Sequence, residues 1–137
     1  MDRATLTPGA EIPMLSRLGT FRTWSHFAAV NYEIADHHMD DEVARHEGFP
    51  GAFAMAPLTF SYLQTMLRDW LGDEGRIVAV SIQLRSPFLR NRTLTAHGRV
   101  TAVHPGEETT VELEVWADDD LGTLITKGTA TVVLVAA

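Results

Sequence analysis

The chain has 137 residues, a length that suits one domain with a single core, and we predict that residues 1–137 form one domain. Hydrophobic residues make up 45% of the chain, which argues against disorder. There is no cysteine, so disulfides, thiolate metal sites and a cysteine nucleophile are excluded. The net charge of −7 and the absence of a basic run disfavour a general nucleic-acid role.

The first third of the chain is predicted to hold short elements joined by polar loops. We interpret residues 1–16 as a leader that is able to add an edge strand, and Leu18–Arg22 as a short strand. Thr23 is a predicted N-cap for a short helix from Trp24 to about Tyr32, and Asp40 is a predicted cap for a second one. The N-terminal stretch lacks the apolar core of a secretory signal, and no apolar run approaches the roughly 20 residues that span a bilayer. We therefore expect a cytoplasmic protein with no membrane association.

The segment from Pro57 to Leu71 has the clearest periodicity. Its apolar residues recur at three- and four-residue spacing, which is typical of one side of a helix. Pro57 suits the first turn because its missing N–H would be unpaired there, and Gly72 suits the helix end. The predicted apolar side consists of Phe60, Tyr62, Leu63, Met66, Leu67, Trp70 and Leu71, and the other side of Thr59, Ser61, Gln64, Thr65 and Arg68.

After this helix the period changes to two. Strands are predicted at 77–84, 93–103, 109–117 and 123–135, joined mostly by short turns. In the first of them Val78, Val80, Ile82 and Leu84 share one face. Strands in succession after one long helix predict an α+β fold, in which an antiparallel sheet curls round the helix.

The loop before the central helix gathers the groups best suited to chemistry. His37 and His38 stand among the acids Glu33, Asp36, Asp40 and Asp41. A histidine beside a carboxylate is a common general acid/base pair, because its pKa lies near neutrality. The alternative is that these are solvated loop residues and helix caps. His97, mid-strand and without an acidic sequence neighbour, is interpreted as structural.

We predict no metal and no cofactor. The spacing of His37, His38 and Asp40 is poor for ligation from one helix face, and no second ligand cluster is present. The sequence also has no phosphate-binding glycine loop and no dinucleotide fingerprint. Arg85, Arg90 and Arg92 lie close together and could receive an anionic tail such as the phosphates of coenzyme A; the alternative is solvated loop charge.

Several of these segments resemble one family. The run His38 to Ala44, the GFPG that follows at 48–51 and the start of the helix at 56–58 resemble the MaoC-like dehydratases, also called (R)-specific enoyl-CoA hydratases. Residues 81–87 and 93–100 resemble two later strands of that family. The resemblance implies the hot-dog fold, a curled antiparallel β-sheet wrapped round one long central helix, which usually dimerises edge to edge.

The resemblance also implies site residues. The family's catalytic histidine falls on His38 and its catalytic aspartate on Glu33. Its asparagine falls on Ala35, so that Asn31 and Asp36 are candidate replacements. The backbone N–H that polarises the thioester oxygen falls near Ala56. The residues predicted to line an acyl tunnel are Phe53, Met55, Phe60 and Tyr62.

The implied function is that of an enzyme, a lyase. It adds or removes water across a trans-2-enoyl thioester carried by CoA or by a carrier protein, with one of Glu33 and His38 taking a proton from water and the other protonating the α carbon. Three alternatives stay open: a catalytically degenerate subunit that partners an active hydratase, a hot-dog thioesterase, and a small-ligand binding protein. The expected partners are the acyl-CoA or acyl-carrier thioester and a second hot-dog subunit, in a homodimer or heterodimer.

Overall fold

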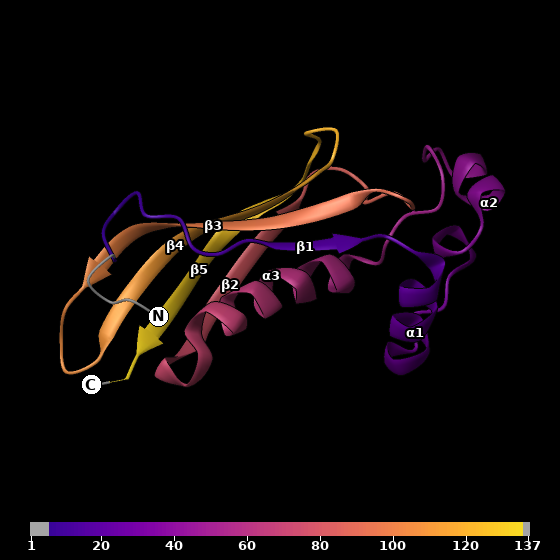
Figure 1. Ribbon diagram of the computed structural model, residues 1–137. Coiled ribbons are helices and arrows are strands. Elements are labelled where there is room, and N and C mark those ends of the chain that lie inside the picture. Colours follow the sequence, from indigo (N-terminus) through magenta and orange to yellow (C-terminus); the bar gives the residue numbers. More distant parts are fainter. Residues whose placement is uncertain (1–5, 136–137) are drawn as a thin grey trace.

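The computed structural model describes residues 6–135. One antiparallel sheet has the strand order β1-β3-β4-β5-β2, and a long helix, α3, lies against one of its faces (Figure 1). The elements, in chain order, are β1 (Leu15–Leu18), α1 (Phe21–Asn31), the short 3-10 helix η2 (Asp36–His38), α2 (Asp41–His46), α3 (Ala56–Leu71), the 3-10 helix η3 (Gly72–Glu74), β2 (Gly75–Leu84), β3 (Thr93–His104), β4 (Thr109–Asp119) and β5 (Leu124–Leu134). The predicted α+β layout is confirmed.

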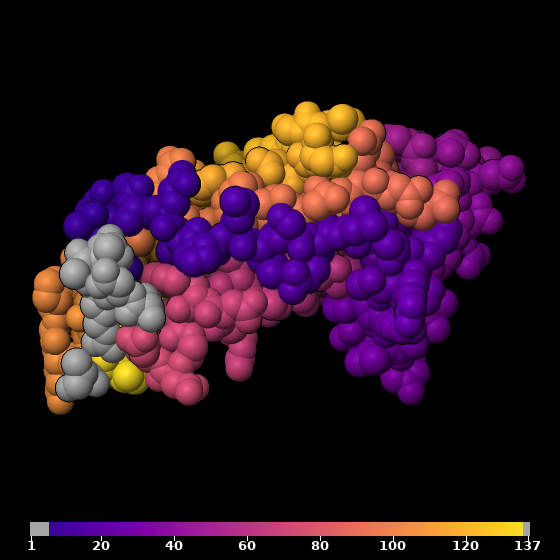
Figure 2. Space-filling view, viewed as in Figure 1, coloured from indigo at the N-terminus to yellow at the C-terminus, as the bar shows by residue number. Residues whose placement is uncertain are grey.

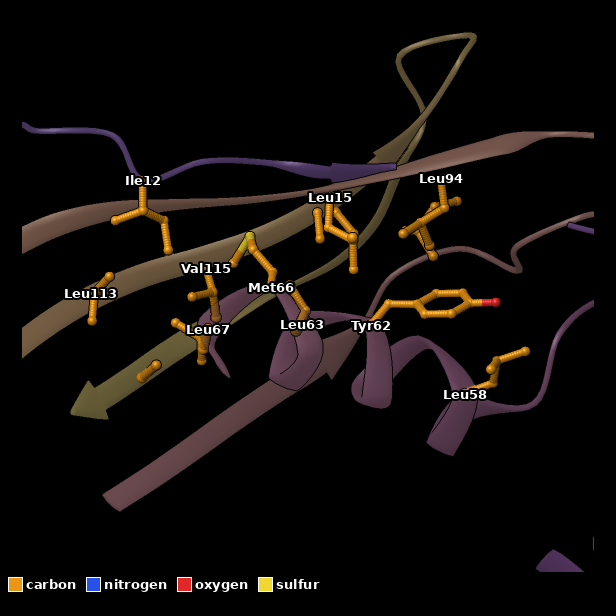
Figure 3. Packing of buried hydrophobic residues seen from close by; sticks show 14 of the residues in the cluster. Ile12, Leu15, Leu58, Tyr62, Leu63, Met66, Leu67, Leu94, Leu113 and Val115 are labelled. Atoms are coloured by element: carbon orange, nitrogen blue, oxygen red, sulfur yellow. The ribbon is translucent and has the colours of Figure 1, made fainter. Parts of the chain in front are cut away.

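Helix α3 forms where its apolar period predicts, and it ends at Gly72, whose φ of 53° is in the left-handed region. Figure 3 shows Leu63, Met66 and Leu67 of this helix directed toward the sheet. Their exposed fractions are at most 1%, so the helix is the centre of the core. The predicted faces need a correction at Thr59, which is 2% exposed rather than on the polar side, while Phe60 and Trp70 are half-buried.

The strands differ in how well they cover this helix. In β4 the alternate residues Val111, Leu113, Val115 and Ala117 are all buried, as their period-two pattern predicts. The edge strand β2 departs from prediction, because Val78 is 56% and Leu84 51% exposed. The pairing of β2 with β5 shifts register between Ile77 and Ala79, and this irregularity moves Val78 off the face that it was predicted to share.

The N-terminal boundaries also need correction. The first strand is Leu15–Leu18, not 18–22, and it pairs with β3 at the sheet edge. Helix α1 begins at Phe21 because the cap is Thr20, whose hydroxyl oxygen accepts the Thr23 N–H at 3.2 Å; Thr23 is thus inside the helix. The predicted cap Asp40 is confirmed, since its carboxylate accepts the N–H groups of two residues in the first turn of α2.

Helices α1 and α2 lie beyond one end of the sheet, on the side of the α3 N-terminus (Figure 1). In the space-filling view they form a projection from the body made by the sheet and α3 (Figure 2). The loop between α1 and α2 carries the candidate acids and histidines, so the fold places them near the start of the buried helix. Within residues 6–135, no helix combines the length and apolar composition needed to cross a membrane.

At Gly128 the pairing of β5 with β2 leaves no room for a side chain. A Cβ at this position in β5 would overlap the Ser81 carbonyl oxygen and the backbone of Ile82 on β2, so the strands would have to separate. We expect Gly128→Ala to lower the free energy of unfolding by at least about 2 kcal/mol. The matched control is Lys127→Ala, an exposed neighbour, which should change it by less than about 0.5 kcal/mol. Equal urea midpoints for the two variants would contradict this packing.

Candidate functional site

The position of Glu33 is set by the end of α1. Tyr32 has a φ of 54°, in the left-handed region, and the backbone N–H groups of Tyr32 and Glu33 both bond to the Ala28 carbonyl oxygen. This is the usual way in which a helix end turns the chain sharply and satisfies its last carbonyls. Ala28 is itself buried, so the turn is anchored to the core and holds the half-buried Glu33 in place.

His38, at the end of η2, is the most buried of the predicted catalytic groups, with an exposed fraction of 6%. Its Nδ1 lies 2.8 Å from the Phe53 carbonyl oxygen. Because a carbonyl only accepts, Nδ1 carries the proton in the neutral ring and the Nε2 lone pair is free to accept one. The ring also meets Phe53 edge-on, with centroids 5.1 Å apart.

The charge state of His38 follows from this environment. Burial lowers the pKa of His38 below its ordinary value of 6.5, while the hydrogen bond to the Phe53 carbonyl and the carboxylate of Glu33 act in the opposite direction. The net effect favours the neutral imidazole near pH 7. Glu33 is therefore within electrostatic reach of His38, although no hydrogen bond joins the two side chains among the described residues.

The other acidic-loop residues are placed differently. The Asp36 side chain is exposed, and within residues 6–135 only its backbone carbonyl has hydrogen-bond partners. His37 stacks on Phe53 with centroids 5.1 Å apart, and its Nδ1 lies 2.8 Å from a carboxylate oxygen of Glu47. His37 thus packs against the side chain of Phe53, the residue whose backbone carbonyl holds His38. No group of three or more potential ligands in the described part of the chain is arranged to hold a metal.

The segment between α2 and α3 is fixed by Asp41, which the sequence indicated only as one of the acids near His37 and His38. One carboxylate oxygen accepts the Ala52 N–H at 2.8 Å, and the other pairs with Arg90. The hydrogen bond from Ala52, followed by the Arg90 guanidinium, lowers the pKa of Asp41. The Ala54 N–H then bonds to the Phe88 carbonyl oxygen at 2.8 Å. These contacts set Phe53 and the start of α3 against the segment that follows β2.

A cavity of about 340 Å³ opens at the start of α3. Of the predicted tunnel residues, Phe53 is in its wall, whereas Met55 and Tyr62 lie in the core and Phe60 borders a neighbouring groove. His38 and Glu33 do not border the cavity either, because His38 lies on the Phe53 side of the wall. The wall is mainly apolar, and it is made by Phe49, Phe53, Ala54, Ala56, Thr59, Leu84, Arg85, Ser86, Pro87, Phe88 and Ile125.

Ala56 is in this wall and is exposed, as a backbone donor to a ligand must be. Its N–H has no protein acceptor among the described residues, as expected in the first turn of a helix. The positive end of the helix dipole adds to the attraction for a carbonyl oxygen at this point.

The three predicted phosphate-binding arginines separate into two kinds. Arg90 pairs with Asp41 and lies over the Phe21 ring, 4.2 Å from its centroid, and Arg92 pairs with Asp120 at 3.5 Å. Both guanidinium groups therefore have structural partners. Arg85 is exposed, borders the cavity and donates to the Gln83 side chain at 2.6 Å. Of the three, it is the one that borders the cavity.

The interpretation of His97 as structural needs one correction, because it does have an acidic neighbour across the sheet. Its Nε2 lies 3.0 Å from a carboxylate oxygen of Asp118 on β4, and its ring stacks on Trp116 with centroids 5.1 Å apart. These residues are 19 and 21 positions away in sequence, so only the strand register brings them together.

Comparison with known proteins gives structural relatives only. No protein-family model and no curated protein matches the chain. Solved structures with a similar fold include the ChsH1–ChsH2 complex from Mycobacterium tuberculosis (24% identity over 93% of this chain and 98% of that one, TM-score 0.82). Another similar structure is an (R)-hydratase from A. caviae involved in PHA biosynthesis (22% identity over 96% of this chain and 98% of that one, TM-score 0.84). A third is a MaoC-like dehydratase from Rhodospirillum rubrum (19% identity over 98% of this chain and 97% of that one, TM-score 0.85).

The class of protein follows from this likeness. The chain has the hot-dog fold that the resemblance implied, with the same curled antiparallel sheet and central helix as the (R)-hydratases. At identities below 25% the likeness establishes the fold.

His38 should make stability depend on pH in a defined direction. Because its pKa is lowered in the folded state, the unfolded chain binds the proton more readily. Its contribution is present above about pH 6.5 and is lost as the pH falls through that value toward the folded-state pKa. We expect wild type to lose more unfolding free energy between pH 7.5 and 5.5 than His38→Gln, which keeps an N–H donor for Phe53 but does not titrate. Urea unfolding at each pH measures this.

The matched control is His26→Gln, which removes an exposed imidazole from α1. It should leave the pH dependence of wild type unchanged. Parallel pH profiles for wild type and His38→Gln would contradict the assignment of a lowered pKa to His38.

Proposed function

We propose that this chain is a MaoC-like acyl-thioester hydratase/dehydratase acting on a trans-2-enoyl thioester of CoA or of a carrier protein. The observation that carries the proposal is the buried His38, within electrostatic reach of the Glu33 carboxylate and held by the Phe53 carbonyl so that Nε2 is free. Phe53 connects this ring to the wall of the cavity at the start of α3. The resemblance in sequence assigns the same two residues. The (R)-hydratase and MaoC-like dehydratase among the similar structures support the reaction class.

The chemistry follows from the state of each group. In hydration, His38 Nε2 takes a proton from water as the water oxygen adds to C3, and the Glu33 carboxylate stabilises the imidazolium that forms. Negative charge moves to the thioester oxygen, where the Ala56 N–H and the helix dipole stabilise it. The His38 imidazolium then gives this proton to C2 of the enolate, so that one water is added in total. Dehydration is the reverse.

Asp36 has no part in this scheme. Its side chain is exposed, so we assign the proton transfer to His38 and the stabilisation of the imidazolium to Glu33, and leave Asp36 as a residue of the turn. Arg85 is proposed to meet the phosphates of the thioester carrier at the cavity mouth.

The assay uses crotonyl-CoA and longer trans-2-enoyl-CoA esters, followed by loss of the enoyl absorbance. We expect His38→Gln to lower kcat/KM by roughly 100-fold to 10,000-fold, the usual effect of removing a general acid or base. Glu33→Gln should also lower it, because the imidazolium loses the carboxylate that stabilises it. His26→Gln is the control and should keep wild-type activity. Turnover by wild type that both site variants match would refute the assignment, and release of free CoA thiol would favour the thioesterase alternative.

We also propose that the working unit contains a second hot-dog subunit paired along β2. This strand is at the sheet edge, so one side of its backbone has no strand partner in the sheet. A groove of about 460 Å³ runs beside it, lined by Ala56, Pro57, Phe60, Ile82 and Leu84. Ala56 and Leu84 border both the groove and the cavity, so a subunit seated there would close the cavity.

The partner is either a second copy or a different hot-dog chain. ChsH1–ChsH2, which has a similar fold, is a complex of two named chains, which supports a heterodimer as the second candidate. The presence of Ala35 at the position of the family's asparagine also supports it. In that case this chain supplies part of the tunnel of an active relative. Purified alone, it would then lack hydratase activity and gain it when mixed with the partner.

A charge on the edge strand should prevent the pairing. Val78 is 56% exposed in the single subunit, so Val78→Lys should leave the subunit folded while it disfavours association. We expect light scattering to show a dimer for wild type and a monomer for Val78→Lys. Thr101→Lys places the same charge at an exposed position on β3 and should remain dimeric. A monomeric wild type, or a dimer that Val78→Lys leaves intact, would contradict the proposed interface.

A further inference from the structure

The first turn of α3 offers fewer backbone donors than a helix start normally does. Pro57 has no N–H, and the N–H groups of Leu58 and Thr59 both bond to the Met55 carbonyl oxygen, at 3.1 and 3.3 Å. In this turn the Ala56 N–H is thus the one backbone donor that the described residues leave unpaired. A thioester oxygen that becomes an oxyanion is commonly met by more than one donor.

Thr59 has a hydroxyl that the fold does not use. The residue is 2% exposed and lines the cavity. No hydrogen bond joins the hydroxyl to any of the described residues, and the hydroxyl oxygen is not among their fully buried unpaired atoms. A threonine inside a helix often donates to the carbonyl four residues earlier, here Met55, but that oxygen already accepts two N–H groups. A hydroxyl without a protein acceptor is free to donate a hydrogen bond to a ligand in the cavity.

The helix geometry brings this hydroxyl toward the Ala56 N–H. Residues three positions apart lie on the same side of a helix, with Cβ atoms about 5–6 Å apart. Each Cα–Cβ bond tilts toward the helix N-terminus, so the Thr59 side chain covers the turn that contains Ala56. Both residues border the same 340 Å³ cavity, as expected for two donors to one ligand atom.

We infer that the Thr59 hydroxyl is the second hydrogen-bond donor to the thioester carbonyl oxygen, and that it completes with the Ala56 N–H an oxyanion site that Pro57 leaves one donor short. The inference rests on the proposed function, because it assigns a role in the same site. Thr59 touches the substrate atom on which charge develops, and it is therefore a catalytic residue. In the absence of substrate its hydroxyl has no acceptor among the described residues.

The variant that tests this role is Thr59→Val, which removes the hydroxyl and keeps the branched shape. We expect kcat on trans-2-enoyl-CoA to fall about 100-fold with KM changed by less than about threefold, because the lost bond strengthens only as charge develops. Thr59→Ser should retain kcat within about threefold. The same Val variant should keep the melting temperature of wild type, since the lost hydroxyl has no partner among the described residues.

The matched control is Thr65→Val on the same helix. The Thr65 hydroxyl donates to the Ser61 carbonyl oxygen at 2.8 Å and does not border the cavity, so kcat should stay near the wild-type value. If Thr59→Val lowers both kcat and the melting temperature, or if Thr59→Ser is as impaired as Thr59→Val, the hydroxyl is structural and the inference is overturned.

A second readout separates this inference from the proposed reaction. Butyryl-CoA has no double bond to hydrate, and the vibrational frequency of its bound thioester carbonyl reports how strongly donors polarise it. We expect the frequency to fall on binding to wild type and to His38→Gln, and to fall less on binding to Thr59→Val. Equal frequencies in wild type and Thr59→Val would overturn the inference, even if the acid/base variants support hydration. Failure of wild type to bind butyryl-CoA would overturn both proposals.

Discussion

The hydrogen bond between His38 and the Phe53 carbonyl connects the two halves of the site. It joins a ring from the loop after α1 to the segment that leads into α3, across 15 residues of sequence. It fixes where the imidazole lies and which nitrogen keeps its proton, and burial favours the neutral ring. This bond therefore links the His38 ring to Phe53, which is in the cavity wall at the start of α3. The proposed roles of Glu33 and of the helix start depend on this position of the ring.

The core positions the start of α3, and the loop segments position the cavity wall around it. Apolar periodicity buries α3 beneath the sheet and therefore sets where its N-terminus emerges. The segment from Ala52 to Ala54 is then held by Asp41 and by the Phe88 carbonyl, so that the cavity wall is tied to both α2 and the end of β2. The exposed edge of β2 leaves one side of this cavity available to another subunit.

The elements that could be predicted from sequence are those with a local signal. The helix at 56–71 has a sustained 3.6-residue period, β4 alternates cleanly, and the Asp40 cap bonds to its own first turn. The edge strand was less predictable, because the register shift after Ile77 depends on its partner strand. The N-terminal strand was predicted a few residues too late in the chain. Because Thr20 rather than Thr23 makes the capping bond, the residues that follow Thr20 belong to α1 and not to a strand.

The candidate site could be proposed from sequence to the extent that it follows a motif. His38 and Glu33 occupy motif positions, whereas Asp41 and Arg90 meet across 49 residues and only the folded chain reveals that pair. Thr59 had a usable signal, because it shares the helical period with Leu63 and Met66, but its polar side chain suggested the solvent side. The tunnel residues Met55 and Tyr62 are apolar enough to belong to the core, and there the structure places them.

The state of the His38 ring tests this account most directly. Nitrogen-15 NMR of the histidine-labelled protein at pH 7 distinguishes a protonated ring nitrogen from an unprotonated one. The account predicts a neutral ring for His38, with the proton on Nδ1 and a free lone pair on Nε2. A ring protonated on Nε2 alone, or a doubly protonated ring, would contradict it.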